Sequence, residues 1–231
     1  MIDRIKRFAN QNKICYYIIY VLFNIYGLFF SVLCFMMRVF PIQKNKIVCC
    51  NMKGKRYGDN PKYIVDEILR EHLPYEIVWL IKKDTDIDLP EGIRPANYNP
   101  FSMAYELTTA KIWIDSNTKP LGVLKRKGQY YIQTWHGSYG LKKMYGDIPD
   151  KMNLFDKRNI QYNSKIQDLF VSNSTFYSEI YRRAFWYKGE ILQSGSPRND
   201  IFFHNRWIAA RNAVETYIGK KQESGVSVQD F

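Results

Sequence analysis

Residues 168–186, DLFVSNSTFYSEIYRRAFW, contain the repeating unit that decides the fold. Residues 168–172 form a short apolar run typical of a buried strand, and residues 175–186 carry apolar side chains at helical spacing. We expect further strands at 46–51, 75–82, 111–115, 130–134 and 190–193, and further helices at 62–72, 102–110, 152–167 and 200–218. This alternation predicts an α/β fold with a doubly wound, mainly parallel sheet.

The composition of the chain is that of a folded, basic protein. Its 231 residues carry 34 Lys and Arg against 22 Asp and Glu, a net charge of +12, and 46% of them are hydrophobic, which excludes a disordered chain. The four cysteines show no CxxC spacing and no flanking histidines, so we expect no metal site and no disulfide framework. P-loop, GxGxxG, HExxH and GxSxG motifs are absent from the sequence, which disfavours nucleotide kinases, dinucleotide enzymes, zinc hydrolases and serine esterases.

Residues 14–37 form an uncharged apolar run, ICYYIIYVLFNIYGLFFSVLCFMM, in which Asn24 is the one strongly polar side chain. Its length exceeds the roughly 20 residues that cross a bilayer core. Seven Lys and Arg against one Asp lie in residues 1–46, on both sides of the run. Three interpretations stay open: a spanning helix, a helix or helical hairpin in the inner leaflet, and a core helix of the domain. We expect a membrane-associating segment at residues 1–45.

Three polar segments follow predicted strands, at the sheet edge where ligands of doubly wound proteins bind. In the first, residues 133–138 (QTWHGS), His136 is positioned to act as a general base, because imidazole titrates near neutrality. The alternative is a structural histidine that caps the next helix. His136 lies in an acid-free window, since no Asp or Glu occurs between Asp115 and Asp147. The cations of this window suit a phosphate-rich substrate and are Lys119, Lys125, Arg126, Lys127, Lys142 and Lys143.

The other two segments offer possible phosphate contacts. Ser174, in residues 172–175 (SNST), is either the N-cap of the following helix or part of an anion site at the free N–H groups of that helix. Arg198, in residues 195–200 (GSPRND), either clamps a phosphate with two hydrogen bonds or pairs with Asp200 to hold the turn.

In combination these motifs resemble the CDP-glycerol glycerophosphotransferase family, which builds teichoic-acid and related polyol-phosphate polymers. The matching stretches are residues 58–62 (GDNPK), 131–137 (YIQTWHG) with Lys142, Lys143 and Asp147, 174–185, and 195–200. After Trp-His-Gly the family commonly has Thr-Pro-Leu-Lys, whereas this chain has Ser-Tyr-Gly-Leu-Lys, one residue longer before Lys142. The resemblance implies a GT-B architecture of two Rossmann-like domains, monotopic at the cytoplasmic face of the cell membrane, while the apolar run also leaves a single-pass protein open.

The resemblance also implies how the chain is divided. Residues 46–206 would be the Rossmann-like acceptor-side domain, the N-terminal half of the GT-B fold. The family's second domain carries the CDP-binding residues and a second active-site histidine, whereas residues 207–231 are predicted as a helix and a polar tail. We therefore expect an acceptor-side half in which the donor-binding domain is missing.

The function that the resemblance implies is transfer of glycerol phosphate from CDP-glycerol, or a related CDP-polyol, to a lipid-linked or polymeric polyol-phosphate acceptor. It implies an acid/base role for His136 and no cofactor. The residues expected at substrate phosphates are Lys142, Lys143, Ser174, Arg198, Asn199 and Asp200. The alternative is a non-catalytic membrane-bound module that binds anionic polymer or lipid-linked phosphate. Nucleic acid is not expected as a partner, because half of the surplus charge flanks the apolar run and recognition motifs are absent from the sequence.

Overall fold

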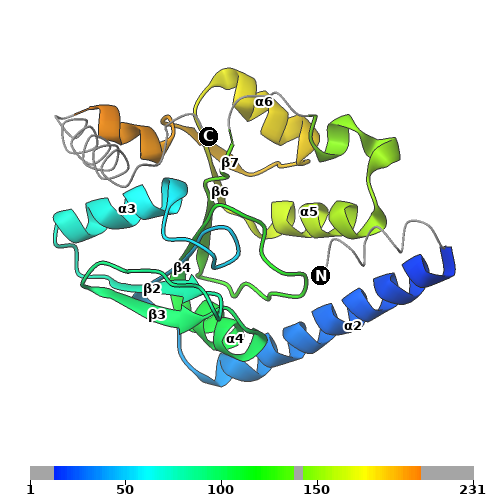
Figure 1. The fold of residues 1–231 in the computed structure, drawn as a ribbon, viewed down its shortest axis with the longest axis horizontal. Helices are drawn as coiled ribbons and strands as arrows, with labels where there is room; N and C mark the ends of the chain where they lie inside the picture. Colours follow the sequence, from blue (N-terminus) through cyan, green and yellow to red (C-terminus); the bar gives the residue numbers. More distant parts are fainter. Residues whose placement is uncertain (1–12, 138–142, 204–231) are drawn as a thin grey trace, which may run out of the picture.

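The computed structural model describes residues 13–137 and 143–203 and confirms the predicted α/β fold. The described strands form one sheet in the order β3-β2-β1-β4-β5-β6-β7, in which every neighbouring pair is parallel (Figure 1). The strands are β1 (Gln43–Cys50), β2 (Glu76–Ile81), β3 (Ile93–Asn97), β4 (Ala110–Asp115), β5 (Tyr130–Gln133), β6 (Leu169–Ser172) and β7 (Glu190–Gln193). The strand order reverses between β1 and β4, which makes their carboxyl ends the expected ligand site.

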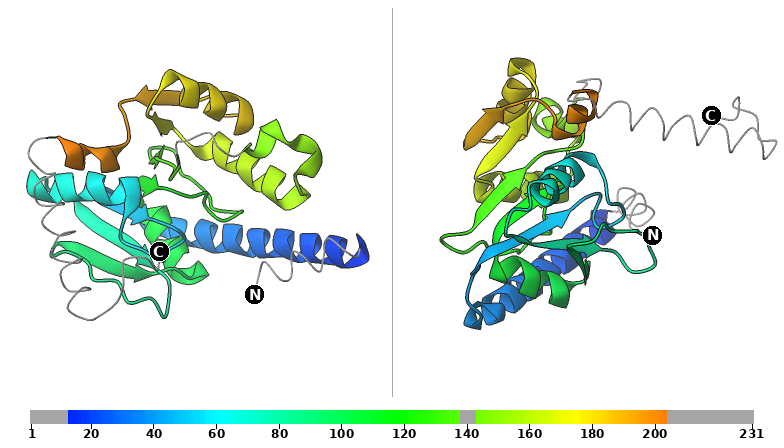
Figure 2. Two further views of the ribbon diagram at one scale, coloured as in Figure 1. Left: turned by 45° about the horizontal axis from the view of Figure 1, so that its top comes forward. Right: turned by 90° about the vertical axis from the view of Figure 1, so that its left-hand side faces the viewer.

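Helices cover both faces of this sheet (Figure 1, Figure 2). They are α2 (Lys13–Met36), α3 (Asp59–Arg70), α4 (Pro100–Thr109), α5 (Leu154–Ile166) and α6 (Thr175–Ala184), with short 3-10 turns η1 (Met37–Val39), η2 (Tyr145–Asp147), η3 (Pro149–Lys151) and η4 (Pro197–Phe202). The cores show the arrangement: α2 and α4 pack on one face of the sheet, and α3 packs on the other.

Strand β1 shows how the sequence produces these layers. Val48 and Cys50 lie in the core under α2 and α4, whereas Ile47 and Cys49 lie in the core under α3. Side chains of a strand alternate between the two faces of the sheet, so a strand that is covered on both faces is apolar throughout. This is why the run at 46–51 predicts a buried strand.

One face of α2 belongs to this core. Phe30 and Cys34 are fully buried and Leu33 is 7% exposed, in one cluster with residues of β1, β4 and α4. Gly27 lies against Gly122, and the Ser31 hydroxyl donates a hydrogen bond to the Gly122 carbonyl oxygen at 2.9 Å. The core-helix interpretation therefore describes this face of α2.

Two elements differ from the sequence-based expectations. β3 was not expected, because Arg94 and Pro95 interrupt its apolar pattern; a proline is tolerated here because β3 forms an edge of the sheet. The helix expected at 200–218 begins instead as the 3-10 turn η4 at Pro197–Phe202. The remainder of that prediction, and the tail at 207–231, lie outside the described residues.

Candidate active site

His136 lies just after β5, and its ring is fixed by the end of the neighbouring strand β4. Nδ1 of His136 is 2.7 Å from the backbone carbonyl oxygen of Ser116. A carbonyl oxygen can only accept a hydrogen bond, so Nδ1 carries the hydrogen and Nε2 of the neutral ring keeps its lone pair. The half-buried imidazole is thus held as the tautomer that can accept a proton through Nε2.

The surroundings of His136 restrict its ring further. The Trp135 indole stacks on the imidazole with 4.3 Å between ring centroids. The Ser116 hydroxyl donates a hydrogen bond to Oδ1 of Asn51, at the end of β1, at 2.6 Å. Nδ2 of Asn117 lies 3.4 Å from Nδ1 of His136. The histidine therefore stands at the β1–β4 reversal, where the doubly wound topology predicts a ligand site.

Arg198 ties two other segments to this histidine. Its Nη1 lies 3.0 Å from Oδ1 of Asp59 and 3.1 Å from the backbone carbonyl oxygen of His136. The backbone N–H of Arg198 also donates to Oδ1 of Asn60 at 3.2 Å. The predicted partner Asp200 is thus replaced by Asp59, because the start of α3 lies against η4.

Asn60 belongs to the site, although the matching stretch at residues 58–62 gives it no role by itself. It is 4% exposed, and its Nδ2 lies 3.2 Å from the backbone carbonyl oxygens of Thr134 and Trp135. Its amide therefore joins α3, the loop that follows β5 and the turn at Arg198. The signal in the sequence is a polar residue directly before a proline at a helix start, which indicates a turn but not its distant partners.

These contacts enclose a small pocket beside the Trp-His-Gly loop. It is lined by residues from all three strand-end segments and from α3 and α6: Asn60, Thr134, Gly137, Val171, Asn173, Tyr181, Gly195, Ser196 and Arg198. The structure therefore brings Arg198 into one site with the loop that carries His136.

The other expected phosphate residues lie differently. Ser174 is the N-cap of α6, where its hydroxyl oxygen accepts a hydrogen bond from the Tyr177 N–H at 3.3 Å, and its neighbour Asn173 lines the pocket instead. Asn199 and Asp200 are exposed on η4 and Lys143 is exposed after β5, none of them lining this pocket. The last of the expected residues, Lys142, lies outside the described residues.

The cations of the acid-free window that the structure describes do not all lie at one surface. Lys119 is buried and pairs with Asp115. Lys125 pairs with Asp168 just before β6, at the amino ends of the strands, whereas His136 lies at their carboxyl ends. Arg126 donates a hydrogen bond to the Phe40 carbonyl oxygen. Linear charge density does not reveal these partners, because Asp168 and Phe40 come from distant parts of the chain and Asp115 lies at the boundary of the acid-free stretch.

Asp115 and Lys119 form a buried ion pair next to the segment that holds the histidine. Both side chains are under 5% exposed, and Asp115 immediately precedes the Ser116 carbonyl that holds His136. Burial raises the pKa of the Asp115 carboxyl to about 6, against the opposing attraction of Lys119. Among the described residues, no cluster of three or more His, Cys, Asp or Glu has the spacing to hold a metal ion.

Comparisons with known proteins identify the family of the chain. The family model for CDP-Glycerol:Poly(glycerophosphate) glycerophosphotransferase matches residues 32–226. A teichoic acid glycerol-phosphate transferase of Staphylococcus aureus is 34% identical over 171 residues, which is 71% of this chain and 43% of the relative. A teichoic acid poly(glycerol phosphate) polymerase of Bacillus spizizenii is 27% identical over 215 residues, 90% of this chain and 52% of the relative.

Solved structures of the wall teichoic acid polymerase TagF are also similar. One of them matches with a TM-score of 0.65 and 29% identity, covering 71% of this chain and 41% of that chain. The chain spans between 23% and 52% of the length of the curated relatives it matches. Since the family model covers most of the sequence, the chain belongs to the CDP-glycerol:poly(glycerophosphate) glycerophosphotransferase family.

Proposed function

We propose that this chain is the acceptor-side part of a glycerophosphotransferase and that His136 is its general base. The observation that supports this most strongly is the 2.7 Å contact between Nδ1 of His136 and the Ser116 carbonyl oxygen, which leaves Nε2 able to accept a proton. A base held in one tautomer at the ligand edge of the sheet needs no rearrangement before it acts.

The proposed reaction starts with the acceptor hydroxyl beside Nε2 of His136. As the proton moves to Nε2, the hydroxyl oxygen attacks the β-phosphorus of CDP-glycerol. A new phosphorus–oxygen bond forms, the bond from that phosphorus to the bridging oxygen breaks, and CMP leaves. The protein lowers the barrier by positioning the reactants and by compensating negative charge, for which the remaining guanidinium N–H groups of Arg198 are our candidate.

We assign attraction of the anionic acceptor to a second group of cations. The loop between β1 and α3 and the end of β2 carry exposed basic side chains at the sheet edge where His136 lies: Lys53, Lys55, Arg56, Lys82 and Lys83. The Lys82 N–H donates to the Gly54 carbonyl oxygen at 2.7 Å, so the two segments are neighbours. A basic rim of this kind raises the local concentration of a polyanion.

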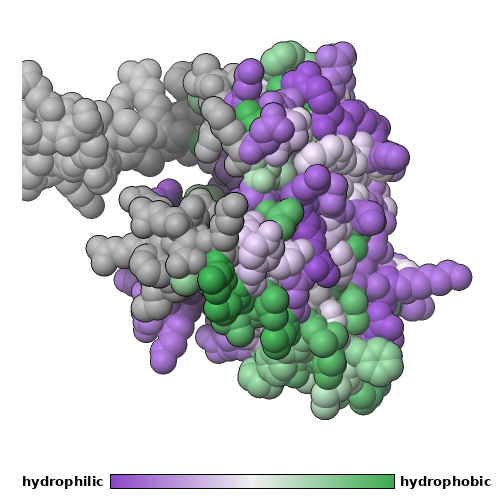
Figure 3. Space-filling model, turned by 90° about the vertical axis from the view of Figure 1, so that its right-hand side faces the viewer, coloured by the Kyte–Doolittle hydropathy of each residue, from purple (hydrophilic) through white to green (hydrophobic). Residues whose placement is uncertain are grey.

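We also propose that α2 lies in the plane of a membrane surface. Residues 14–39 are long and apolar enough to span a membrane, but the helix packs on the α/β domain along one face. Its other face is a stripe at helical spacing: Ile14, Tyr17, Ile18, Val21, Leu22, Ile25, Leu28, Val32 and Phe35. Figure 3 shows hydrophobic surface gathered at the lower margin of the molecule. A helix with one protein-facing and one apolar exposed side suits a monotopic arrangement.

The test of the proposed function is release of CMP. The chain is combined with membranes that contain acceptor, with CDP-glycerol, and with the donor-binding part of a teichoic acid polymerase supplied as a second polypeptide. We expect CMP release to need both polypeptides. The second candidate function, a non-catalytic module that binds anionic polymer, is favoured by the exposed basic side chains at the same sheet edge, which can attract a polyanion without a donor. Acceptor binding with no CMP release in the combined assay would support that candidate instead.

A further inference from the structure

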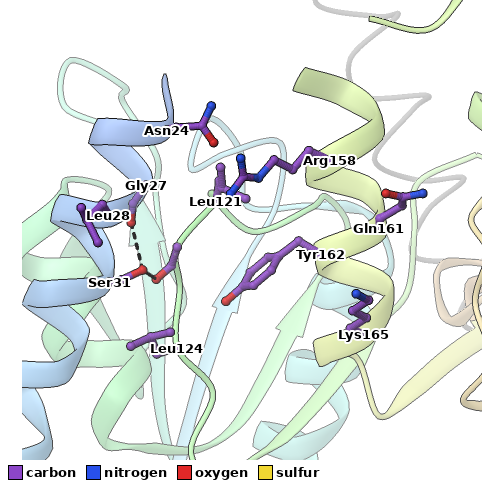
Figure 4. A pocket seen from close by; sticks show the side chains of 11 residues that line it. Asn24, Gly27, Leu28, Ser31, Leu121, Leu124, Arg158, Gln161, Tyr162 and Lys165 are labelled. Atoms are coloured by element: carbon purple, nitrogen blue, oxygen red, sulfur yellow. Dashed lines mark hydrogen bonds between the residues drawn. The ribbon is translucent and has the colours of Figure 1, made fainter. Parts of the chain in front are cut away.

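A pocket of about 370 Å³ lies between α2, α5 and the loop at residues 121–124 (Figure 4). Leu28, Leu121 and Leu124 give it apolar walls. Its lining shares no residue with that of the pocket beside His136. The proposed transfer reaction therefore leaves this pocket without a role.

One side of the pocket is cationic. Arg158 and Lys165 both line it and are both exposed, and their spacing of seven residues places them on the same face of α5. Arg158 extends from α5 across the pocket toward α2, where its Nη1 lies 3.4 Å from the Tyr20 hydroxyl (Figure 4). Among the described residues, neither cation has a carboxylate within ion-pair distance. Both charges are therefore available to an anion.

The polar groups that line the pocket differ in whether the protein itself satisfies them. The hydroxyls of Ser31 and Tyr162 donate to backbone carbonyl oxygens of Gly122 and Val123. Asn24 is different: its Nδ2 donates to the Tyr20 carbonyl oxygen at 2.6 Å, but its buried Oδ1 has no hydrogen-bond partner among the described residues. A buried amide oxygen without a donor favours a ligand that brings a hydroxyl.

The cationic pocket continues onto the exposed apolar face of α2. A neighbouring groove is lined by Tyr20, Val21, Asn24, Ile25, Leu28 and Arg158. It shares Asn24, Leu28 and Arg158 with the pocket, so one ligand can occupy both. Leu28 is 67% and Ile25 is 56% exposed, which is a large apolar area to leave in water.

We propose that this pocket binds the headgroup of an anionic membrane phospholipid with a hydroxyl-bearing head, such as a phosphatidylglycerol. Arg158 binds the phosphate, Lys165 adds positive charge, and Oδ1 of Asn24 accepts a hydrogen bond from the headgroup hydroxyl. The acyl chains lie along Val21, Ile25 and Leu28. The inference rests on the membrane association proposed above, and adds to it a specific lipid site that would fix the orientation of the domain on the bilayer.

The test measures binding of the full chain to vesicles. The pocket variant is Arg158→Ala with Lys165→Ala, and the matched control is Lys127→Ala with Lys157→Ala, which removes the same charge from exposed side chains outside the pocket. Each is mixed with vesicles of phosphatidylcholine, with and without phosphatidylglycerol. We expect the pocket variant to bind the anionic vesicles about tenfold more weakly than the control, since a charge-assisted hydrogen bond from Arg158 to the lipid phosphate adds to the general surface attraction. On neutral vesicles the two should be equal, and Arg158→Lys with Lys165→Arg should restore binding.

Three results would overturn the proposal. Equal loss in the pocket variant and the control would mean that only general surface charge attracts the lipid. Absence of binding by the unmodified chain to any vesicle would remove the membrane partner, while the His136 mechanism would keep its own test through CMP release. Release of the chain from anionic vesicles by free glycerol phosphate would mean that the pocket recognises a soluble phosphate and not a lipid.

Discussion

Nη1 of Arg198 lies 3.0 Å from the Asp59 carboxylate, although 139 residues separate them in the sequence. The same guanidinium reaches the backbone carbonyl oxygen of His136 at 3.1 Å. One side chain therefore connects the start of α3, the turn after β7 and the catalytic loop that we propose. Because Arg198 contacts both Asp59 and the His136 backbone, the Arg198–Asp59 pair should affect the position of His136 as well as the free energy of unfolding.

We predict that Arg198 and Asp59 act as a unit. In a double-mutant cycle of Arg198→Ala and Asp59→Asn, the unfolding free energies should show a coupling of roughly 1 kcal/mol, because the pair is only partly exposed. The measurement is urea unfolding in a mild detergent. The exposed Arg70–Glu67 pair, probed with Arg70→Ala and Glu67→Gln, provides the control and should couple by under about 0.5 kcal/mol. Equal coupling in the two cycles would contradict this assignment.

The buried Asp115–Lys119 pair should be needed as a pair. Lys119→Met alone leaves the buried Asp115 carboxylate without its partner and should cost about 3–5 kcal/mol of unfolding free energy at neutral pH. The double variant Asp115→Asn with Lys119→Met should be more stable than Lys119→Met, since it leaves no unpaired charge. A double variant no more stable than Lys119→Met would show that the two side chains do not depend on each other.

Asp115 should also give the chain a distinct pH dependence. Its raised pKa, about 6, means that the folded state binds a proton more tightly than the unfolded state, where a carboxyl titrates near 4. The contribution of this group to stability is therefore largest below about pH 4 and falls as pH rises to about 6, by on the order of 2–3 kcal/mol. Unfolding free energies of the unmodified chain minus those of Asp115→Asn should fall over this range. A difference in unfolding free energy that rises with pH would contradict this prediction.

Gly122 should be required for packing of α2. Its φ is +92°, and a Cβ at this position would collide with the Gly27 carbonyl oxygen. Gly128 is the matched control, because its φ is +91° and a Cβ added there would meet no atom of another segment within 4 Å. Gly128→Ala should cost only the backbone strain, about 1 kcal/mol, whereas Gly122→Ala should cost at least about 2 kcal/mol more. Equal costs would show that α2 does not pack here.

Much of the fold could be predicted because its signals are local. The runs at 46–51 and 168–172 are apolar on both faces of the sheet, and each appears as a strand within a few residues of the expected position. β3 was not predicted, because its Arg94 and Pro95 hide a strand that only its edge position permits. For α2 the sequence predicted the helix but could not decide which face the domain covers.

The sequence could predict which residues belong to the candidate site, but it could not predict most of their contacts. The rule that ligands bind at strand ends selected His136 and Arg198, which the structure joins through a hydrogen bond. The acid-free stretch grouped Lys119 and Lys125, which pair with Asp115 at the end of β4 and with Asp168 just before β6. Charges close in sequence can have distant partners, and only the folded chain reveals which of them are neutralised.

The role of His136 is tested most directly by the rate of CMP release, with CDP-glycerol, acceptor membranes and the donor-binding polypeptide present. The test variant is His136→Asn. The control is His72→Asn, at an exposed histidine with a φ of +50° that asparagine tolerates. Loss of a general base should lower the rate by about 10²–10⁴-fold, while the control stays near the unmodified rate. A His136→Asn variant that releases CMP as fast as the control would contradict the mechanism.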